Sequence, residues 1–160
     1  MCTTMGIHEF NHVKELLNRS GIAYEVSEHA PVYTSEEAAN VRGVELKTGV
    51  KALVFKTEQG RLVLGLIAAD RKMNLKKLAK IAGARKLVLA SPQDVLKATG
   101  CEVGSVHPFG NLFGFTTYMD ISVLENDSVN FNAGLHTVSI YMKAKDLVKA
   151  IKPVMSEFSK

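Results

Sequence analysis

The segment VKALVFKTEQGRLVLGLIAA, residues 50–69, constrains the fold of this chain more than any other part. Two apolar runs flank Gln59 and Gly60, and a polar residue followed by glycine between two such runs predicts a β-hairpin. Each run is nearly continuously apolar, whereas a strand with one face in water alternates apolar and polar side chains. The sequence therefore predicts two antiparallel strands at the centre of a sheet that is covered on both faces.

Helical and extended segments alternate around this hairpin. Helices are predicted over residues 8–19, from Ser35 after a capping box of Thr34 and Glu37, over 74–83, over 91–100 with Asp94 closing a second capping box, and over 145–158 with an interruption or bend at Pro153. Strands are predicted over 22–29, 85–90, 115–124, 128–134 and 137–142. This mixture predicts an α+β fold with a mixed, partly closed, barrel-like β-sheet and surrounding helices, in which residues 1–160 form a single domain.

The composition excludes several classes of protein. The chain has two cysteines, Cys2 and Cys101, with no C-x-x-C pair and no zinc spacing, so neither a disulfide framework nor a zinc site is predicted. Its apolar runs are too short to span a bilayer, and the N-terminus lacks the basic start and apolar core of a signal peptide. We therefore expect a cytoplasmic protein with no membrane partner.

The basic residues are clustered in a chain whose formal net charge is +4. Six of them lie within residues 72–86, among them Lys76, Lys77 and Lys80 on a predicted helix, and four more lie within residues 143–152. Such clusters form either solvated helix faces or a surface that contacts the phosphates of a nucleic acid.

Three arrangements of side chains are candidates for chemistry. His8 and His12 stand four residues apart on a predicted helix, a spacing that can chelate a metal, but no third ligand has a recognisable spacing and no metal is expected. Cys101 and His107 are a candidate nucleophile and base without a visible orienting partner. Lys51 stands inside an apolar strand, where its ammonium group requires water, an anion or another partner.

Four pieces of the sequence are similar to the YbaK/prolyl-tRNA synthetase-associated editing domain family, in the order and spacing of that family. They are EHAPVYTSEEAA, VKALVF, LAKIAGARKLVLASPQDVLKATGCEVGSVHPFG and NAGLHTVSI, and the similarity extends over about residues 10–150. Its most specific features are a strand lysine, matched by Lys51, and a Gly-x-x-x-Pro loop, matched by residues 104–108. The resemblance implies an α+β fold, no cofactor, and hydrolysis of amino acids that are wrongly attached to tRNA.

The resemblance also implies a site. The expected catalytic residues are Lys51, Gly104, Ser105, Val106, His107 and Pro108, and the backbone N–H groups of the loop would stabilise an oxyanion. The expected substrate-binding residues are His29, Tyr33, Thr34, Ala52, Asn132, Gly134 and Ser139. Relatives often have threonine or asparagine in place of Ala52, and some cysteinyl-tRNA deacylases have serine and aspartate in place of Asn132 and Ser139. These departures leave the amino acid open among the Cys, Ala and Pro types.

We therefore expect a freestanding deacylase that acts in trans on aminoacyl-tRNA, with a synthetase as a further candidate partner and no DNA partner. Lys76, Lys77 and Lys80 would contact the tRNA. Two other functions fit the residues. One is a non-catalytic module that binds RNA or a nucleotide in the same pocket, and the other is a thiol hydrolase that uses Cys101 and His107.

Overall fold

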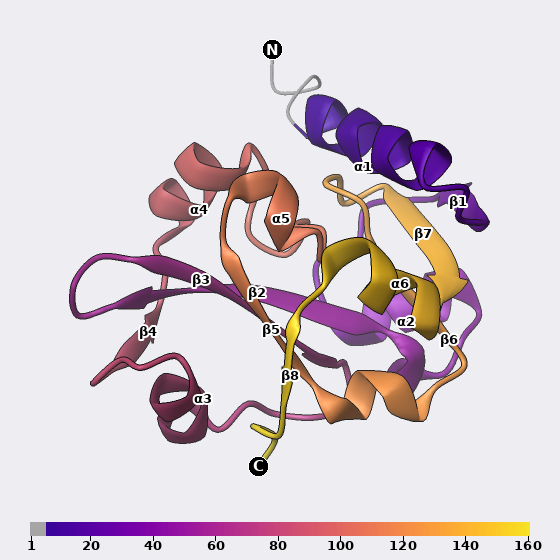
Figure 1. The fold of residues 1–160 in the computed structure, drawn as a ribbon. Coiled ribbons are helices and arrows are strands. Elements are labelled where there is room, and N and C mark those ends of the chain that lie inside the picture. Colours follow the sequence, from indigo (N-terminus) through magenta and orange to yellow (C-terminus); the bar gives the residue numbers. More distant parts are fainter. Residues whose placement is uncertain (1–5) are drawn as a thin grey trace.

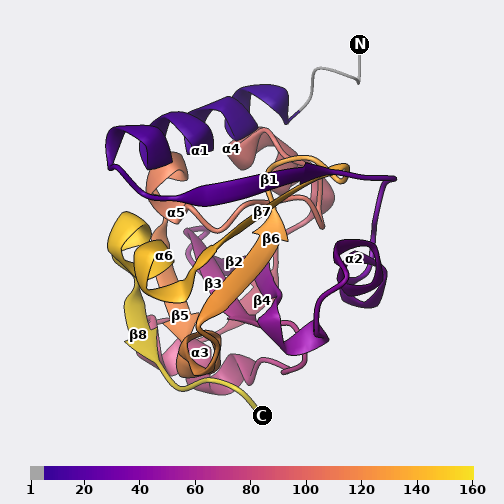
Figure 2. The ribbon, with the colours of Figure 1, turned by 90° about the vertical axis from the view of Figure 1, so that its right-hand side faces the viewer.

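The computed structural model describes residues 6–160, so Cys2 lies outside the described residues. Its strands form two sheets, as Figures 1 and 2 show from two directions. The larger sheet has the strand order β4-β2-β3-β5-β8, and the smaller has the order β1-β7-β6. The strands are β1 (Tyr24–Glu28), β2 (Val50–Thr57), β3 (Leu62–Ala68), β4 (Leu87–Leu89), β5 (Thr116–Asp120), β6 (Ser128–Asn132), β7 (Val138–Lys143) and β8 (Val154–Ser156).

The predicted central hairpin is confirmed. β2 and β3 pair antiparallel from Val50 opposite Ala68 to Lys56 opposite Leu62, and both are inner strands of the larger sheet. β5 runs parallel to β3 and β8 runs parallel to β5, so the sheet is mixed. An isolated bridge between Gly49 and Asn130 links the two sheets without closing them into a barrel. The α+β class with a partly closed, mixed arrangement is therefore as predicted.

Helices and the smaller sheet cover both faces of the larger sheet. The α-helices are α1 (Ile7–Arg19), α2 (Ser35–Arg42), α3 (Leu75–Ile81), α4 (Pro92–Thr99), α5 (Gly110–Phe113) and α6 (Ala144–Ile151), and two 3₁₀ helices are η2 (Leu46–Thr48) and η3 (Ile121–Glu125). One core, with Val54 and Leu64 of the larger sheet, packs against α1, α4, α6 and the smaller sheet. A second core, with Phe55 and Val63, packs against α3 on the opposite face. No described helix is both long and apolar enough to cross a membrane.

Local signals place the helix starts. Thr34 and Glu37 form the predicted reciprocal capping box of α2, and the Asn74 side chain accepts from the Lys77 N–H at the start of α3. Ser91 caps α4 by accepting from the Asp94 N–H. The predicted second capping box is wrong, because the Asp94 carboxylate binds the Lys56 ammonium at 3.0 Å instead.

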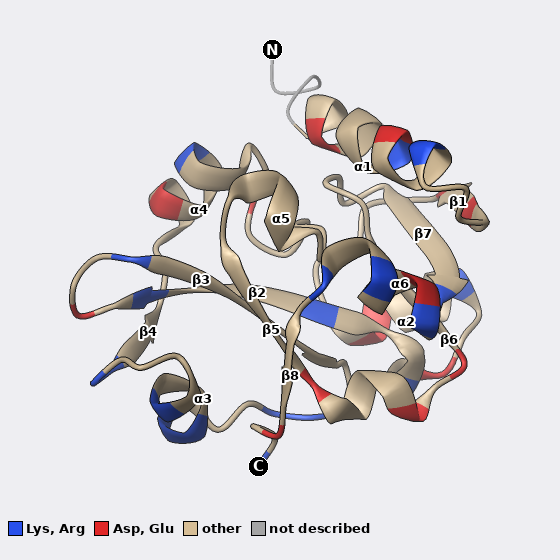
Figure 3. Ribbon diagram, in the orientation of Figure 1, with Lys and Arg blue, Asp and Glu red and all other residues tan. Residues whose placement is uncertain are grey.

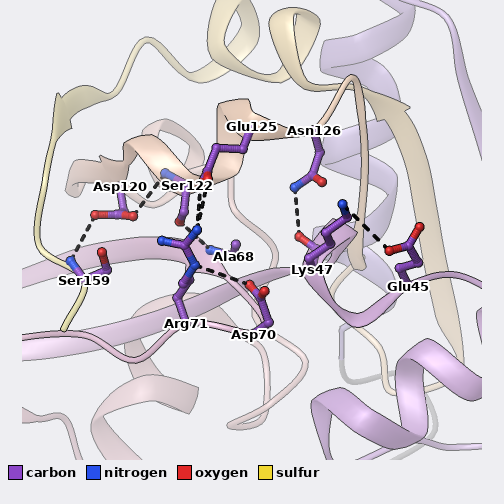
Figure 4. Close-up of polar contacts among 10 residues, drawn as sticks. All are labelled: Glu45, Lys47, Ala68, Asp70, Arg71, Asp120, Ser122, Glu125, Asn126 and Ser159. Atoms are coloured by element: carbon purple, nitrogen blue, oxygen red, sulfur yellow. Dashed lines mark hydrogen bonds and ion pairs between the residues drawn. The ribbon is translucent and has the colours of Figure 1, made fainter.

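Two predicted elements differ from the structure near the C-terminus. The strand predicted over 115–124 ends at Asp120, whose buried carboxylate accepts from the N–H groups of Ser122, Phe158 and Ser159 and starts η3 (Figure 4). The helix predicted over 145–158 with an interruption or bend at Pro153 ends at Ile151 and does not resume after the proline. The following residues form β8, because proline cannot donate the next helical hydrogen bond and β5 offers a free edge.

Candidate functional site

A cavity of about 260 Å³ lies between α2, the start of β2, the end of β6 and the loop after α4. Seven residues of the predicted site line it, and they come from four segments that are far apart in the sequence. These residues are Tyr33, Thr34, Lys51, Ala52, Gly104, Val106 and Asn132. The fold thus brings the strand lysine and the glycine loop to one place.

The cavity exists because one edge of β2 is left open. β4 pairs with β2 only at the far end, from Phe55 to Thr57, and the Ala90 N–H extends this pairing to the Val54 carbonyl. Residues 50–53 therefore have no strand of the larger sheet on this side. Side chains from both faces of β2 reach the cavity, Val50 and Ala52 from one face and Lys51 and Leu53 from the other.

Lys51 is half-buried at this open edge. Its ammonium group makes no hydrogen bond and no ion pair with another residue of the described range 6–160. The lining also contains the cation Arg42 and the carboxylate Glu45, and Glu45 is mostly exposed and lies 3.8 Å from the Lys47 ammonium. The positive charge of Lys51 is therefore available to an anionic ligand.

The loop 104–108 contributes a glycine and a buried valine to the wall of the cavity. Gly104 has φ +90° and Val106 is buried, and both line the cavity. The N–H groups of these two residues donate to no other described residue, whereas the Ser105 N–H donates to the Glu102 carbonyl. Ser105, His107 and Pro108 lie buried behind the surface of the loop, outside the lining.

Arg42 is a site residue that the sequence did not single out. It is the last residue of α2, it lines the cavity, and its guanidinium donates to three neutral oxygens. The Nε atom donates to Ser139 Oγ at 2.7 Å, Nη1 to Asn130 Oδ1 at 2.9 Å and Nη2 to Asn132 Oδ1 at 2.7 Å. Burial lowers the pKa of Arg42 to about 10, so the group is still charged at neutral pH. A basic residue in the last turn of a helix is common, and this position carried no signal of its own.

Three of the predicted substrate-binding residues lie behind the cavity rather than in its lining. The His29 ring is 2.7 Å from Ser139 Oγ through Nε2, and Ser139 is fully buried. Gly134 is buried with φ +95°, and its N–H donates to the Ser105 carbonyl at 2.9 Å. His29 and Ser139 thus support Arg42, and Gly134 supports the loop.

His136 is a second residue that sequence reasoning missed, although it stands in the segment NAGLHTVSI. Its Nδ1 is 3.0 Å from the Val32 carbonyl oxygen, and its ring lies 4.6 Å from the ring of Tyr33. Its Nε2 lies 3.6 Å from a carboxylate oxygen of Glu102. A Cβ added to Gly104 would lie 3.4 Å from the His136 ring, so this histidine borders the loop.

His107 and Cys101, the candidate base and nucleophile, are both buried outside the lining of this cavity. The imidazole stacks on Phe113 at 4.4 Å, and its Nδ1 accepts from the Phe109 N–H. Burial lowers the pKa of His107 to about 3 and raises the pKa of the fully buried Cys101 thiol to about 12. Neither residue lines the cavity.

The remaining candidates lie elsewhere on the molecule. The rings of His8 and His12 lie 4.1 Å apart, and both residues line a separate pocket with His107. Residues 6–160 contain no group of three or more histidine, cysteine, aspartate or glutamate side chains that could hold a metal. Lys76, Lys77 and Lys80 are exposed on α3, which covers the sheet face away from α1 and α6. Figure 3 shows basic positions on α3, which lies apart from α2.

The chain is similar to known proteins in both sequence and structure. The profile of the aminoacyl-tRNA editing domain family matches residues 29–150. The chain is 33% identical over 147 residues to the Multifunctional Ser/Thr-tRNA deacylase ProXp-y of Escherichia coli strain K12, a match that covers 89% of this chain and 88% of that protein. It is 39% identical over 83 residues to a proline–tRNA ligase of Thermosipho melanesiensis, which covers 51% of this chain and 14% of the ligase. A solved structure proposed to be a trans-editing enzyme for prolyl tRNA synthetase has a TM-score of 0.84 at 26% identity, covering 95% of this chain and 97% of that one. The chain described here belongs to the aminoacyl-tRNA editing domain family.

Proposed function

We propose that this protein acts in trans, in the cytoplasm, on mischarged tRNA and hydrolyses the ester between the amino acid and the terminal ribose in the cavity between α2, β2, β6 and the Gly104 loop. Membership of the editing family makes it a hydrolase of aminoacyl-tRNA esters in general terms. The observation that carries the specific mechanism is that Gly104 and Val106 line the cavity and that their backbone N–H groups donate to no other described residue.

These two N–H groups would stabilise the oxyanion of the tetrahedral intermediate. Attack of water on the ester carbonyl moves a negative charge onto the carbonyl oxygen, and fixed amides that already point at that oxygen need no reorganisation. Gly104 brings the backbone close to the ester because it has no side chain and adopts φ +90°. The loop is therefore a catalytic surface made of backbone.

Lys51 would supply positive charge to the same end of the substrate. Its ammonium group can bind the ester carbonyl oxygen, where charge develops during attack, or the phosphate of the terminal nucleotide. Both groups lie at the 3′ end of an aminoacyl-tRNA, and the half-buried position of Lys51 in the lining strengthens an interaction with either.

The proton of the attacking water would go to the substrate itself. The only carboxylate in the lining is that of Glu45, which is mostly exposed, and no described histidine lines this cavity. A vicinal ribose hydroxyl of the terminal adenosine lies beside the ester and can relay the proton to the leaving oxygen. Substrate assistance of this kind requires no side-chain base.

The amino acid removed would be small. A cavity of about 260 Å³ must hold the aminoacyl group and part of the ribose, and its walls offer the polar side chains of Thr34, Asn130 and Asn132. We place Ser and Thr ahead of the Cys, Ala and Pro types, because a hydroxyl can pair with these groups and because the E. coli relative carries the name of a Ser/Thr-tRNA deacylase.

A panel of charged tRNAs tests the proposal. Ser-, Thr-, Ala-, Cys- and Pro-charged tRNA are each incubated with the pure protein, and release of the amino acid is followed over time. We expect release from at least one of the five, fastest with Ser or Thr, and loss of release in Lys51→Ala. Tight binding of tRNA without release from any of them would favour the non-catalytic RNA-binding module.

A further inference from the structure

The Arg42 guanidinium is the common donor of three hydrogen bonds behind the cavity. Its three hydrogen bonds reach two strands of the smaller sheet, at Asn130 and Asn132 on β6 and at Ser139 on β7. None of the three partners carries a charge. A guanidinium that is largely buried is usually paired with a carboxylate. Arg42 is instead held by three hydrogen bonds to neutral oxygens.

Arg42 also sets the direction of the hydrogen bonds that follow. A guanidinium only donates, so the amide oxygens of Asn130 and Asn132 must face Arg42, and their NH₂ groups must face away. The Asn132 NH₂ group then donates to the Gly104 carbonyl oxygen at 2.5 Å, and the Asn130 NH₂ group donates to Thr48 Oγ1 at 2.9 Å. If Asn132 were turned over, its oxygen would face the oxygen of Gly104 and the contact would be repulsive.

The bond to Gly104 fixes the orientation of the loop. A carbonyl oxygen that accepts from Asn132 cannot rotate into the cavity, where it would repel a developing oxyanion. Both peptide groups of Ser105 are held as well. The Ser105 N–H donates to the Glu102 carbonyl, and the Ser105 carbonyl accepts from the Gly134 N–H. Asn132 is thus the one described side chain that donates to the Gly104 carbonyl.

We propose that Arg42 is the positioning residue of this site, which acts through Asn132 to hold the Gly104 loop in the conformation that presents its N–H groups to the ester. This role rests on the proposed function for its catalytic consequence, but its structural consequence does not. Arg42 also contributes a positive charge in the cavity wall, which favours the same oxyanion.

The test uses three single variants and one double variant of the full chain. Arg42→Gln removes the guanidinium, whereas Asn132→Ala removes the hydrogen bond to Gly104 together with one of the three Arg42 hydrogen bonds and leaves those to Asn130 and Ser139. The double variant combines the two changes. Arg71→Gln is the matched control, because Arg71 pairs with Glu125 outside the lining of the cavity. Circular dichroism and thermal unfolding establish the folded fraction of each variant.

The first measurement is steady-state release of the amino acid at several concentrations of charged tRNA. We expect Arg42→Gln and Asn132→Ala each to lower kcat by about tenfold to a hundredfold with a small change in KM, because a misplaced loop weakens the transition state more than the bound substrate. The double variant should lose no more than the worse single variant, since both cut one chain of contacts. A double variant whose fold-loss of kcat equals the product of the two single losses would overturn the proposal. So would an Asn132→Ala variant with the kcat of the wild type.

The second measurement does not depend on activity. The Ser105 N–H donates to the Glu102 carbonyl, and the Gly134 N–H donates to the Ser105 carbonyl. Amide hydrogen exchange at Ser105 and Gly134 should accelerate in Arg42→Gln and in Asn132→Ala and stay unchanged in Arg71→Gln. Unchanged exchange in the first two variants would reject the positioning role even if the wild type released no amino acid from any tRNA. Faster exchange together with an inactive wild type would instead reject the proposed function and leave the loop contact established.

Discussion

The side-chain NH₂ group of Asn132 donates a hydrogen bond of 2.5 Å to the backbone carbonyl of Gly104. The two residues are 28 positions apart, at the end of β6 and in the loop after α4. This contact joins the smaller sheet to the loop that faces the open edge of β2.

Gly104→Ala should lower deacylation far more than it lowers stability. The φ of +90° costs an alanine on the order of 1–2 kcal/mol, and relief of that strain would turn the peptide away from the ester. Gly60→Ala is the control, since Gly60 has φ +85° in the hairpin turn with open space around it and lies outside the cavity. Single-turnover rates and melting temperatures of both variants check this. Equal losses of rate in the two would show that strain alone, and not the position of the loop, explains the effect.

Lys51→Ala should keep the fold and lose on the order of a hundredfold in turnover if the ammonium contacts developing charge. Two substrates distinguish whether the lysine binds the ester carbonyl or the terminal phosphate. Aminoacyl-adenosine lacks the terminal phosphate, so a loss that persists on this small ester assigns Lys51 to the carbonyl, and a loss confined to aminoacyl-tRNA assigns it to the phosphate. Lys149→Ala, an exposed lysine of α6, serves as the control. Wild-type turnover by Lys51→Ala on both substrates would remove this lysine from the site.

The buried imidazole of His107 should make stability depend on pH below neutrality. Burial lowers the pKa of His107 from 6.5 to about 3, so between these values the unfolded chain binds a proton that the folded chain does not. This contribution is fully present above pH 6.5 and is lost as the pH falls toward 3, by at most about 1.4 kcal/mol per pH unit. His107→Asn, which keeps an acceptor for the Phe109 N–H, should show a flatter fall of melting temperature with acid while its folded fraction still releases the amino acid. An inactive but folded His107→Asn would instead favour a catalytic histidine.

Cys101→Ala should retain deacylation at a cost of about 1 kcal/mol in stability. The thiol is fully buried with its pKa raised to about 12 by burial, so it holds its proton at neutral pH and cannot attack an ester. The measurement is the rate of release by the variant beside that of the wild type. Abolished release in a folded Cys101→Ala protein would restore the thiol hydrolase.

Replacing Lys76, Lys77 and Lys80 together with glutamine should weaken tRNA binding and leave kcat unchanged. All three lysines are exposed on α3, on the sheet face away from the smaller sheet, so they can contact the phosphates of the tRNA body but not the ester. Each lost phosphate contact should reduce the slope of log affinity against log salt by about one. A triple variant with an unchanged slope would identify this cluster as a solvated helix face.

The sequence by itself determined the elements that depend on local chemistry. The hairpin of β2 and β3 follows from two apolar runs around Gln59 and Gly60, and the start of α2 follows from the pairing of Thr34 with Glu37. Lys51 and Gly104 were predicted from their family motif, a lysine inside an apolar strand and a Gly-x-x-x-Pro loop.

The tertiary structure decided everything that depends on which segments meet. β8 forms only because β5 offers a free edge, and the Asp120 carboxylate is buried where the N–H groups of the distant residues Phe158 and Ser159 reach it. Arg42 resembles any basic residue at the end of a helix until β6 and β7 place three oxygens around it. His107 resembles a catalytic base until Phe113 covers it. Burial and hydrogen bonds between distant segments are properties of the folded chain, and the residues one to four positions away do not encode them.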